Sequence, residues 1–322
     1  MSAPSLDLFI PPVDPTYVPW GCHDQLAKVI KSAQFFPPFI AGPSGTGKSI
    51  MVEQICAALG REYVRIQITP ETDEDSLIGG FRLVNGDTVF HEGPVLKAMK
   101  AGAVCLIDEM DRGTNKIMCL QGVMEGKPVL VKRTGEIVYP SPGFNIIATG
   151  NTKGRGSEDG KYIAATIIDD AFLERFPIMF DHYYPSTEVE TKIVHNHMDK
   201  YGCYDESTLE ALVRWGQKTR DNAKDDGDDR ISTRRLCHIV QTLSIMGGDD
   251  DAAVEMCVNR YDTENSLAFV QFYKAIKPEI AAAKAAAART AKLNESSAER
   301  KEDAEAVAKR VLQQHYSTKY KP

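Results

Sequence analysis

The sequence lacks the cysteine pattern that a disulfide framework or a zinc site requires. Its seven cysteines are odd in number and widely spaced, and no two of them form a CxxC pair. Some lie within apolar runs, as Cys105 does in the segment 103–107. Disulfide-rich domains and zinc modules show paired, closely spaced cysteines instead. We therefore expect reduced thiols that fill the core of a cytoplasmic protein.

Long apolar runs and an excess of basic residues are also missing. No apolar run approaches the ~20 residues that a membrane-spanning helix needs, and the N-terminus has no basic-then-apolar signal pattern. The formal net charge is −7, which disfavours a protein that coats nucleic acid but leaves room for a local basic stripe. With 43 % hydrophobic and 26 % charged residues, the chain has the composition of a soluble protein. No membrane association is expected.

The first half of the chain alternates strand signals with helix signals. Buried strands are predicted by apolar or alternating runs at 39–41, 63–68, 104–107 and 145–149. Helical spacing spans 23–32 and 50–59. Strands that alternate with helices indicate an α/β domain built around a parallel sheet.

Changes in composition along the 322 residues predict how the chain is divided. The Pro-rich residues 1–20 predict an extended N-terminal arm, and 21–185 the α/β domain. Helical patterns without a strand signal predict a small all-helical domain over 186–278. The Ala-rich, charged segment 279–322 is expected to form a helical or disordered tail.

A glycine-rich loop carries the clearest chemical signal. It fits the pattern G-x-x-x-x-G-K-[ST] and consists of Gly42, Pro43, Ser44, Gly45, Thr46, Gly47, Lys48 and Ser49. Its glycines allow several N–H groups to converge on phosphate oxygens, and the following helix directs its N-terminus at the same anion. Lys48 adds a charge at the β- and γ-phosphates, and the Ser49 hydroxyl can ligate Mg²⁺. A chance turn is the alternative, but the flanking strand and helix favour a site for ATP with Mg²⁺.

Two carboxylates follow the predicted strand 104–107. In nucleotide hydrolases an Asp in this position holds Mg²⁺ through water, and the adjacent Glu orients or deprotonates the attacking water. Asp108 would then serve the metal and Glu109 the catalysis. A solvated turn is the alternative, which the upstream loop disfavours.

Three further polar residues are candidates for the same site. Asn151 follows the strand 145–149, where its amide can reach the γ-phosphate, although Asn is also common in turns. Arg175 ends a helical segment and can either stabilise phosphoryl transfer in a neighbouring subunit or interact with the helix dipole. Arg234 lies at the start of a predicted helix, where the helix dipole makes a cation mildly unfavourable. A contact with the nucleotide would explain an arginine in this position.

In this order and spacing, these motifs resemble those of the AAA+ ATPases over roughly residues 15–275. Within that class the chain is similar to the MoxR branch, and most of all to the CbbQ/NorQ/CobS group. The segments that carry this resemblance are 75–81 with 88–95, 123–139, 144–152 and 232–234. They are similar to a hairpin inserted into the second helix, a helix and hairpin before the sensor 1 strand, that strand, and the sensor 2 motif Ser-x-Arg. The resemblance implies a P-loop NTPase three-layer domain with a parallel sheet, β-hairpin inserts and a helical lid.

The resemblance also implies a role for each candidate residue. Lys48 binds phosphate, Ser49 and Asp108 serve Mg²⁺, Glu109 activates water, Asn151 is sensor 1, Arg175 is the finger supplied to a neighbour, Arg234 is sensor 2, and Arg112 is a second interface arginine. It further implies a homo-oligomeric ring, expected to be a hexamer, that remodels or activates a protein client or a von Willebrand A-domain partner, in some relatives with insertion of a metal. Two departures concern the substrate: Asp111 stands where MoxR relatives have Asn, and the Gly-rich loop 153–166 is more similar to CobS.

Other functions share part of this pattern. A nucleic-acid motor of the McrB type could use the three cations of the segment 127–134, although the acidic balance and the lack of an aromatic platform argue against it. A scaffold with little turnover would not need both Asp108 and Glu109. A small-molecule kinase would share the loop 42–49 but would leave Arg234 and the helical second domain unexplained.

Overall fold

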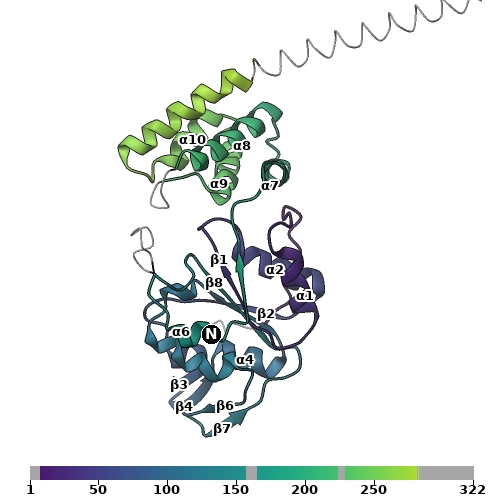
Figure 1. Cartoon of the computed structure of the whole chain (residues 1–322), viewed down its shortest axis with the longest axis vertical. Coiled ribbons are helices and arrows are strands. Elements are labelled where there is room, and N and C mark those ends of the chain that lie inside the picture. The colour runs from purple at the N-terminus through teal and green to yellow at the C-terminus, as the bar shows by residue number, and fades with distance from the viewer. Residues whose placement is uncertain (1–7, 157–164, 224–228, 281, 283–322) are drawn as a thin grey trace, which may run out of the picture.

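The computed structural model of the chain describes residues 8–156, 165–223, 229–280 and 282 (Figure 1). Its centre is a five-stranded sheet in which neighbouring strands run parallel, in the order β2-β5-β8-β1-β9. The strands are β1 (Pro38–Ala41), β2 (Tyr63–Gln67), β5 (Val104–Asp108), β8 (Asn145–Gly150) and β9 (Ile178–Asp181). The predicted α/β fold with a parallel sheet and a helical C-terminal region is confirmed. The edge strand β9 was not predicted, because its short segment carries no clear period.

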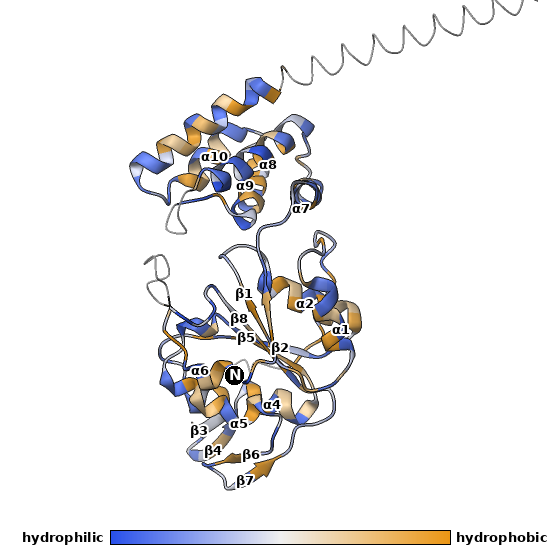
Figure 2. Ribbon diagram, viewed as in Figure 1, coloured by the Kyte–Doolittle hydropathy of each residue, from blue (hydrophilic) through white to orange (hydrophobic). Residues whose placement is uncertain are grey.

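Helices cover both faces of the sheet, as Figure 1 shows. The central strand β5 is buried on both sides: Val104 and Leu106 share one apolar cluster with α1 (His23–Lys31) and α2 (Lys48–Leu59), whereas Cys105 and Ile107 share another with α4 (Pro94–Ala101). Successive side chains of a strand point to opposite faces, so a strand between two helical layers must be apolar throughout. Figure 2 shows this hydrophobic character along β1.

Two antiparallel hairpins extend from the α/β part at the end opposite the C-terminal helices (Figure 1). They consist of β3 (Gly79–Val84) with β4 (Asp87–Glu92), and β6 (Val129–Val131) with β7 (Glu136–Val138). Both hairpins expected from the resemblance are therefore present. Short helical segments connect the remaining parts: α3 (Glu74–Leu77), η1 (Met110–Arg112), η2 (Asn115–Leu120), α5 (Gln121–Met124) and α6 (Asp170–Leu173).

The C-terminal helices build a core of their own around Trp215, which is fully buried. They are α7 (Thr187–Tyr201), α8 (Glu206–Asp221), α9 (Thr233–Ile245) and α10 (Asp250–Val258), and residues 263–280 are helical as well. We call these helices the lid. The sequence did not predict α10 or the helix at 263–280. The exact division of the chain into domains stays a prediction.

Within the described residues, no helix combines the length and apolarity needed to cross a membrane.

The described part of the N-terminal arm runs along the α/β part without forming a helix. Phe9 forms an antiparallel bridge with Tyr63 of the edge strand β2, and the carbonyl oxygen of Pro12 accepts a hydrogen bond from Nε2 of Gln54 at 3.2 Å. The arm thereby reaches from the sheet edge toward the glycine-rich loop. The first seven residues, most of the loop 153–166 and almost all of the predicted tail lie outside the described residues.

Candidate functional site

The glycine-rich loop connects β1 to α2, and α2 begins at Lys48, two residues earlier than predicted. Gly45 and Gly47 have φ angles of 81° and 88°, in the left-handed region that favours glycine. A Cβ atom on Gly45 would lie 2.6 Å from the hydroxyl oxygen of Ser232, so glycine allows the lid to approach the loop. The N–H groups of Gly45 and Gly47 donate no hydrogen bond to a described residue. Such donors before a helix suit an anion.

The Lys48 side chain is buried against its own loop. Its ammonium nitrogen donates to the carbonyl oxygens of Gly42 (2.7 Å) and Pro43 (2.9 Å), and to Oδ1 of Asn151 (3.3 Å). Burial lowers the pKa of Lys48 to about 8, against the opposing charge of Asp111. Lys48 and Asn151, which are 103 positions apart in the chain, thus come into contact at the carboxyl ends of β1 and β8.

Asp108, at the end of β5, is buried and holds three side chains. Its Oδ1 accepts hydrogen bonds from the Ser49 hydroxyl at 2.8 Å and from the Thr149 hydroxyl, and its Oδ2 accepts from Nε of Arg65 at 2.7 Å. Ser49 and Asp108 therefore bring together two oxygen groups of the kind that Mg²⁺ prefers, and these residues fit the metal. The sequence analysis assigned no role to Thr149, although this residue lies in the segment 144–152 that it used, and Arg65 belongs to none of its motifs.

Glu109 has a φ of 56°, which is unusual for a residue with a side chain. Its N–H donates to Oγ1 of Thr149 at 3.2 Å. Its carboxylate accepts a hydrogen bond from Nε2 of Gln67 at 2.9 Å, and Nε of Arg112 lies 3.4 Å from the same oxygen. Unfavourable backbone angles of this kind concentrate at functional sites. Arg112, which the resemblance suggested for a subunit interface, contacts Glu109 of its own chain.

Asp111 has a structural task at the same edge. The residue is fully buried, and its Oδ2 accepts hydrogen bonds from the N–H groups of Asn151 (2.7 Å) and Thr152 (2.9 Å). Its other oxygen, Oδ1, has no hydrogen-bond partner among the described residues. The carboxylate thereby holds the backbone directly after β8 in place, and this backbone positions the side-chain amide of Asn151.

Asp111→Ala is expected to lower the free energy of unfolding by about 2–4 kcal/mol, because the N–H groups of the half-buried residues Asn151 and Thr152 would lose their acceptor. Asp111→Asn is the matched control: its amide oxygen can still accept both bonds, so we expect it to cost less than about half as much. Urea denaturation followed by circular dichroism measures both losses. Equal losses for the two variants would contradict this explanation.

Arg234, at the start of α9, faces the glycine-rich loop. Its N–H donates to the carbonyl oxygen of Gly45 at 3.2 Å, and the residue lines a cavity of about 430 Å³ beside the loop. Tyr17 and Trp20 of the N-terminal arm and His238 of α9 form other walls of this cavity. A cavity of this size next to a phosphate-binding loop is large enough for a nucleoside.

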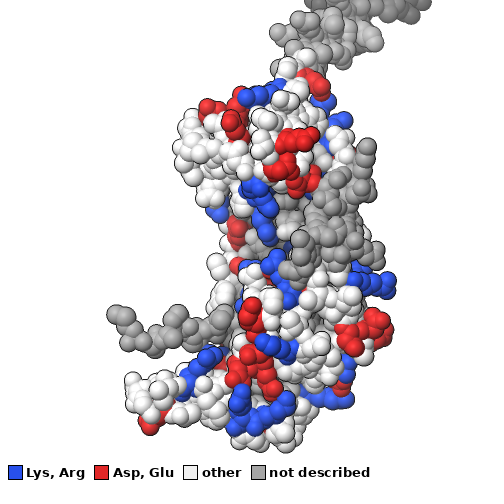
Figure 3. Space-filling view, turned by 90° about the vertical axis from the view of Figure 1, so that its left-hand side faces the viewer, with Lys and Arg blue, Asp and Glu red and all other residues white. Residues whose placement is uncertain are grey.

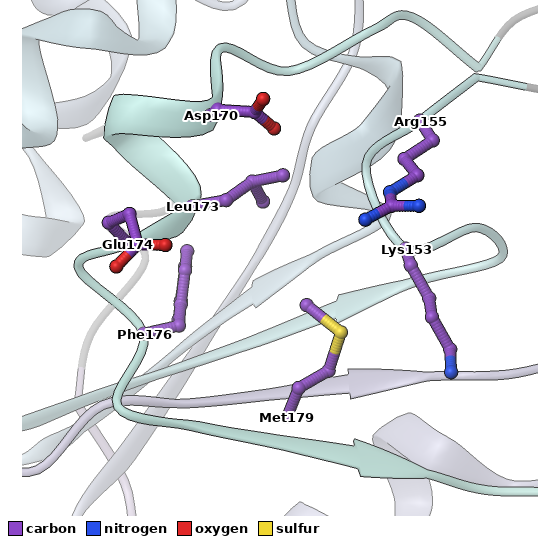
Figure 4. Close-up of a pocket in the computed structure, with 7 residues that line it drawn as sticks. All are labelled: Lys153, Arg155, Asp170, Leu173, Glu174, Phe176 and Met179. Carbon is purple, nitrogen blue, oxygen red and sulfur yellow. The ribbon is translucent and has the colours of Figure 1, made fainter.

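Arg175 lies apart from this cavity. Its guanidinium pairs with Glu125, with Nε 3.1 Å from Oε1, and also donates to the carbonyl oxygen of Ala171. A separate groove of about 460 Å³ opens next to it (Figure 4), lined by Lys153, Arg155, Asp170, Leu173, Glu174, Phe176 and Met179. Figure 4 shows Asp170 and Arg155 on facing sides of this groove. Within one chain, the structure does not bring Arg175 to the glycine-rich loop.

His182, directly after β9, supports the loop from inside the protein. The side chain is fully buried, its Nε2 lies 3.1 Å from the carbonyl oxygen of Thr46, and its ring packs against Trp20. Burial lowers the pKa of His182 to about 4, so the neutral ring can donate Nε2–H to Thr46 at neutral pH. A single histidine at the end of a strand belongs to no recognisable motif, so the sequence analysis did not predict a role for His182.

Part of the chain matches a known protein family, and the chain is similar to several known proteins. Residues 37–169 match the family described as AAA domain (dynein-related subfamily). The chain is 29 % identical to Protein NorQ of Paracoccus denitrificans over 75 % of its own length and 85 % of the relative. It is 27 % identical to Protein CbbQ of Hydrogenophilus thermoluteolus over 64 % of this chain and 73 % of the relative. It is also 29 % identical to aerobic cobaltochelatase subunit CobS of Sinorhizobium sp over 58 % of each chain.

Proposed function

We propose that the chain is an ATP hydrolase that works as a ring, because residues 37–169 match the AAA domain of the dynein-related subfamily and the chain is similar to NorQ, CbbQ and CobS. ATP hydrolysis is the general kind of reaction of this ATPase family. The observation that carries the proposal is the convergence of Lys48, Asp108 and Asn151 at the glycine-rich loop. Arg175 pairs with Glu125 outside this cluster and would complete the site of a neighbouring subunit.

Each residue at the loop has a defined task in this mechanism. Lys48 and the N–H groups of the loop bind the phosphates. Ser49 and Asp108 would hold Mg²⁺, which would offset the charge of the phosphate oxygens. Glu109 takes the proton of the attacking water, and Asn151 orients the γ-phosphate or that water.

The ring would act on another protein. Large apolar side chains are exposed on both hairpins, with Leu83 at 77 %, Leu130 at 54 % and Ile137 at 57 % exposure. Exposed apolar surface of this kind is typical of an interaction site. We propose a hexamer that couples lid movement to remodelling of a client or of a von Willebrand A-domain partner. The relative CobS is named as a subunit of a cobaltochelatase. This name supports the proposal that the present chain also functions in a larger assembly, and it is compatible with metal insertion.

No observation favours the alternative of a nucleic-acid motor. The three cations at and beside the β6–β7 hairpin each pair with a carboxylate: Lys127 with Glu125, Lys132 with Glu74 and Arg133 with Asp75. On the face in Figure 3, acidic and basic side chains are intermixed. A protein that binds the phosphate backbone would present unpaired cations along one surface.

The proposal predicts that ATP turnover per subunit rises with protein concentration, by at least about tenfold between dispersed and associated protein, because the finger comes from a neighbour. Phosphate release and sedimentation velocity, measured over one dilution series, test this. A Lys48→Ala series controls for contaminating phosphatases and should show no turnover at any concentration. Turnover that is absent, or that stays constant per subunit while the protein associates, would contradict the proposal.

A further inference from the structure

A buried ion pair lies inside the lid. The side chains of Glu190 on α7 and Arg220 on α8 are 0 % and 9 % exposed, and the guanidinium contacts Oε2 of the carboxylate. Two charges in an apolar core add little net stability, because the cost of desolvation offsets their attraction. A role in fixing one arrangement of the chain is the best-attested reason to keep such a pair. The other contacts of the pair point to the start of α9.

The pair holds the chain that leads into α9. Arg220 donates a hydrogen bond to the carbonyl oxygen of Ile231 at 2.8 Å. Oε1 of Glu190 accepts a hydrogen bond from the hydroxyl of Thr233 at 2.7 Å, and Thr233 is itself buried. Arg234 follows Thr233 directly, so the ion pair is bonded to two of the three residues before Arg234.

Tyr184 connects the same pair to the glycine-rich loop. The residue lies between β9 and α7, and the Arg220 guanidinium lies 4.8 Å from the centre of its ring. Its hydroxyl donates to the carbonyl oxygen of Ser44 at 3.2 Å. The next carbonyl oxygen along the loop, that of Gly45, accepts the N–H of Arg234 at 3.2 Å. Two consecutive loop carbonyls are therefore bonded to the lid and its connection.

We propose that Tyr184, Arg220 and Glu190 are positioning residues, which hold Arg234 at the phosphate end of the cavity and tie its position to the loop. The inference rests on the proposed ATP hydrolysis. The Arg234 guanidinium makes no hydrogen bond or ion pair with any residue that the structure describes, so its position depends on the backbone before it. A rotation of the lid must either break the bond between Arg234 and Gly45 or move the loop with it.

Tyr184→Phe tests this role, since it removes the hydroxyl and keeps the ring under Arg220. We expect kcat/KM for ATP to fall by about fivefold to tenfold, with an ADP dissociation constant that changes by less than about twofold. In an Arg234→Ala background, the same substitution should change kcat/KM by less than about twofold, because its effect passes through Arg234. Steady-state kinetics and calorimetric titration with ADP give these values.

Two further variants make the test specific. Tyr183→Phe makes the same chemical change at a neighbouring tyrosine that is 63 % exposed, and it should leave all constants within about twofold of wild type. Arg220→Lys keeps the charge but loses the planar stacking group and one of the fixed donors, so it should reproduce the effect of Tyr184→Phe. Additive effects in the double variant, or equal losses for ATP and ADP, would overturn the positioning role alone. Wild-type protein without ATP turnover would overturn the proposed function and this role together.

Discussion

Glu109→Gln should lower the steady-state rate of ATP hydrolysis by about a hundredfold to ten thousandfold, the usual contribution of a positioned general base. An amide of nearly the same shape cannot take the proton of the attacking water. The groups that bind phosphate are unchanged by the substitution, and Lys48 keeps its contacts with the loop. We therefore expect the dissociation constant for ATP to stay within about twofold of wild type. Phosphate release and calorimetric titration with ATP measure the two quantities.

The matched control for this variant is Glu71→Gln, which removes a carboxylate from an exposed position outside the described cavities. Its turnover should equal that of wild type. Hydrolysis by Glu109→Gln at the wild-type rate would remove Glu109 from the mechanism. A parallel loss of ATP binding would instead point to a structural role for the left-handed turn at this residue.

Arg175→Ala should reduce turnover by about a thousandfold or more, the range measured for arginine fingers, and should leave ATP binding by each subunit intact. The guanidinium pairs with Glu125 on its own chain, away from the cavity beside the loop, so its loss does not alter the groups that hold the phosphates. Arg214→Ala is the control, because it removes another surface arginine that pairs with a carboxylate, here Glu279. This control should keep wild-type turnover.

Mixing two inactive variants decides between an arginine that acts within its own chain and one supplied by a neighbour. An Arg175→Ala subunit keeps an intact loop and base, and a Glu109→Gln subunit keeps its arginine. Random mixing of equal amounts in a ring with head-to-tail interfaces should restore activity at up to about a quarter of the sites. A mixture as inactive as its components, under conditions in which mixed rings form, would show that Arg175 does not act across the interface.

Much of the fold follows from local sequence. The apolar runs at 104–107 and 145–149 correspond to β5 and β8, and the helical spacing at 23–32 corresponds to α1. These predictions succeed because a strand buried between two helical layers must be apolar throughout. A helix with one buried face must repeat its apolar residues with the helical period. The segment of β9 lacks such a signal, because its four residues are too few to show a period, and its place in the sheet depends on pairing with β1.

The sequence by itself determined the glycine-rich loop, because the left-handed φ angles of Gly45 and Gly47 depend on glycine and the helix α2 begins within the motif at Lys48. It also determined which carboxylates end a buried strand. Only the tertiary structure decided how the polar partners meet: Arg65 and Thr149 at Asp108, and Tyr184 and Arg220 between the loop and the lid. A polar side chain produces no periodic pattern in the sequence from which its hydrogen-bond partner could be predicted. The partner is set by strand order and helix packing, which bring residues far apart in the chain within hydrogen-bonding distance.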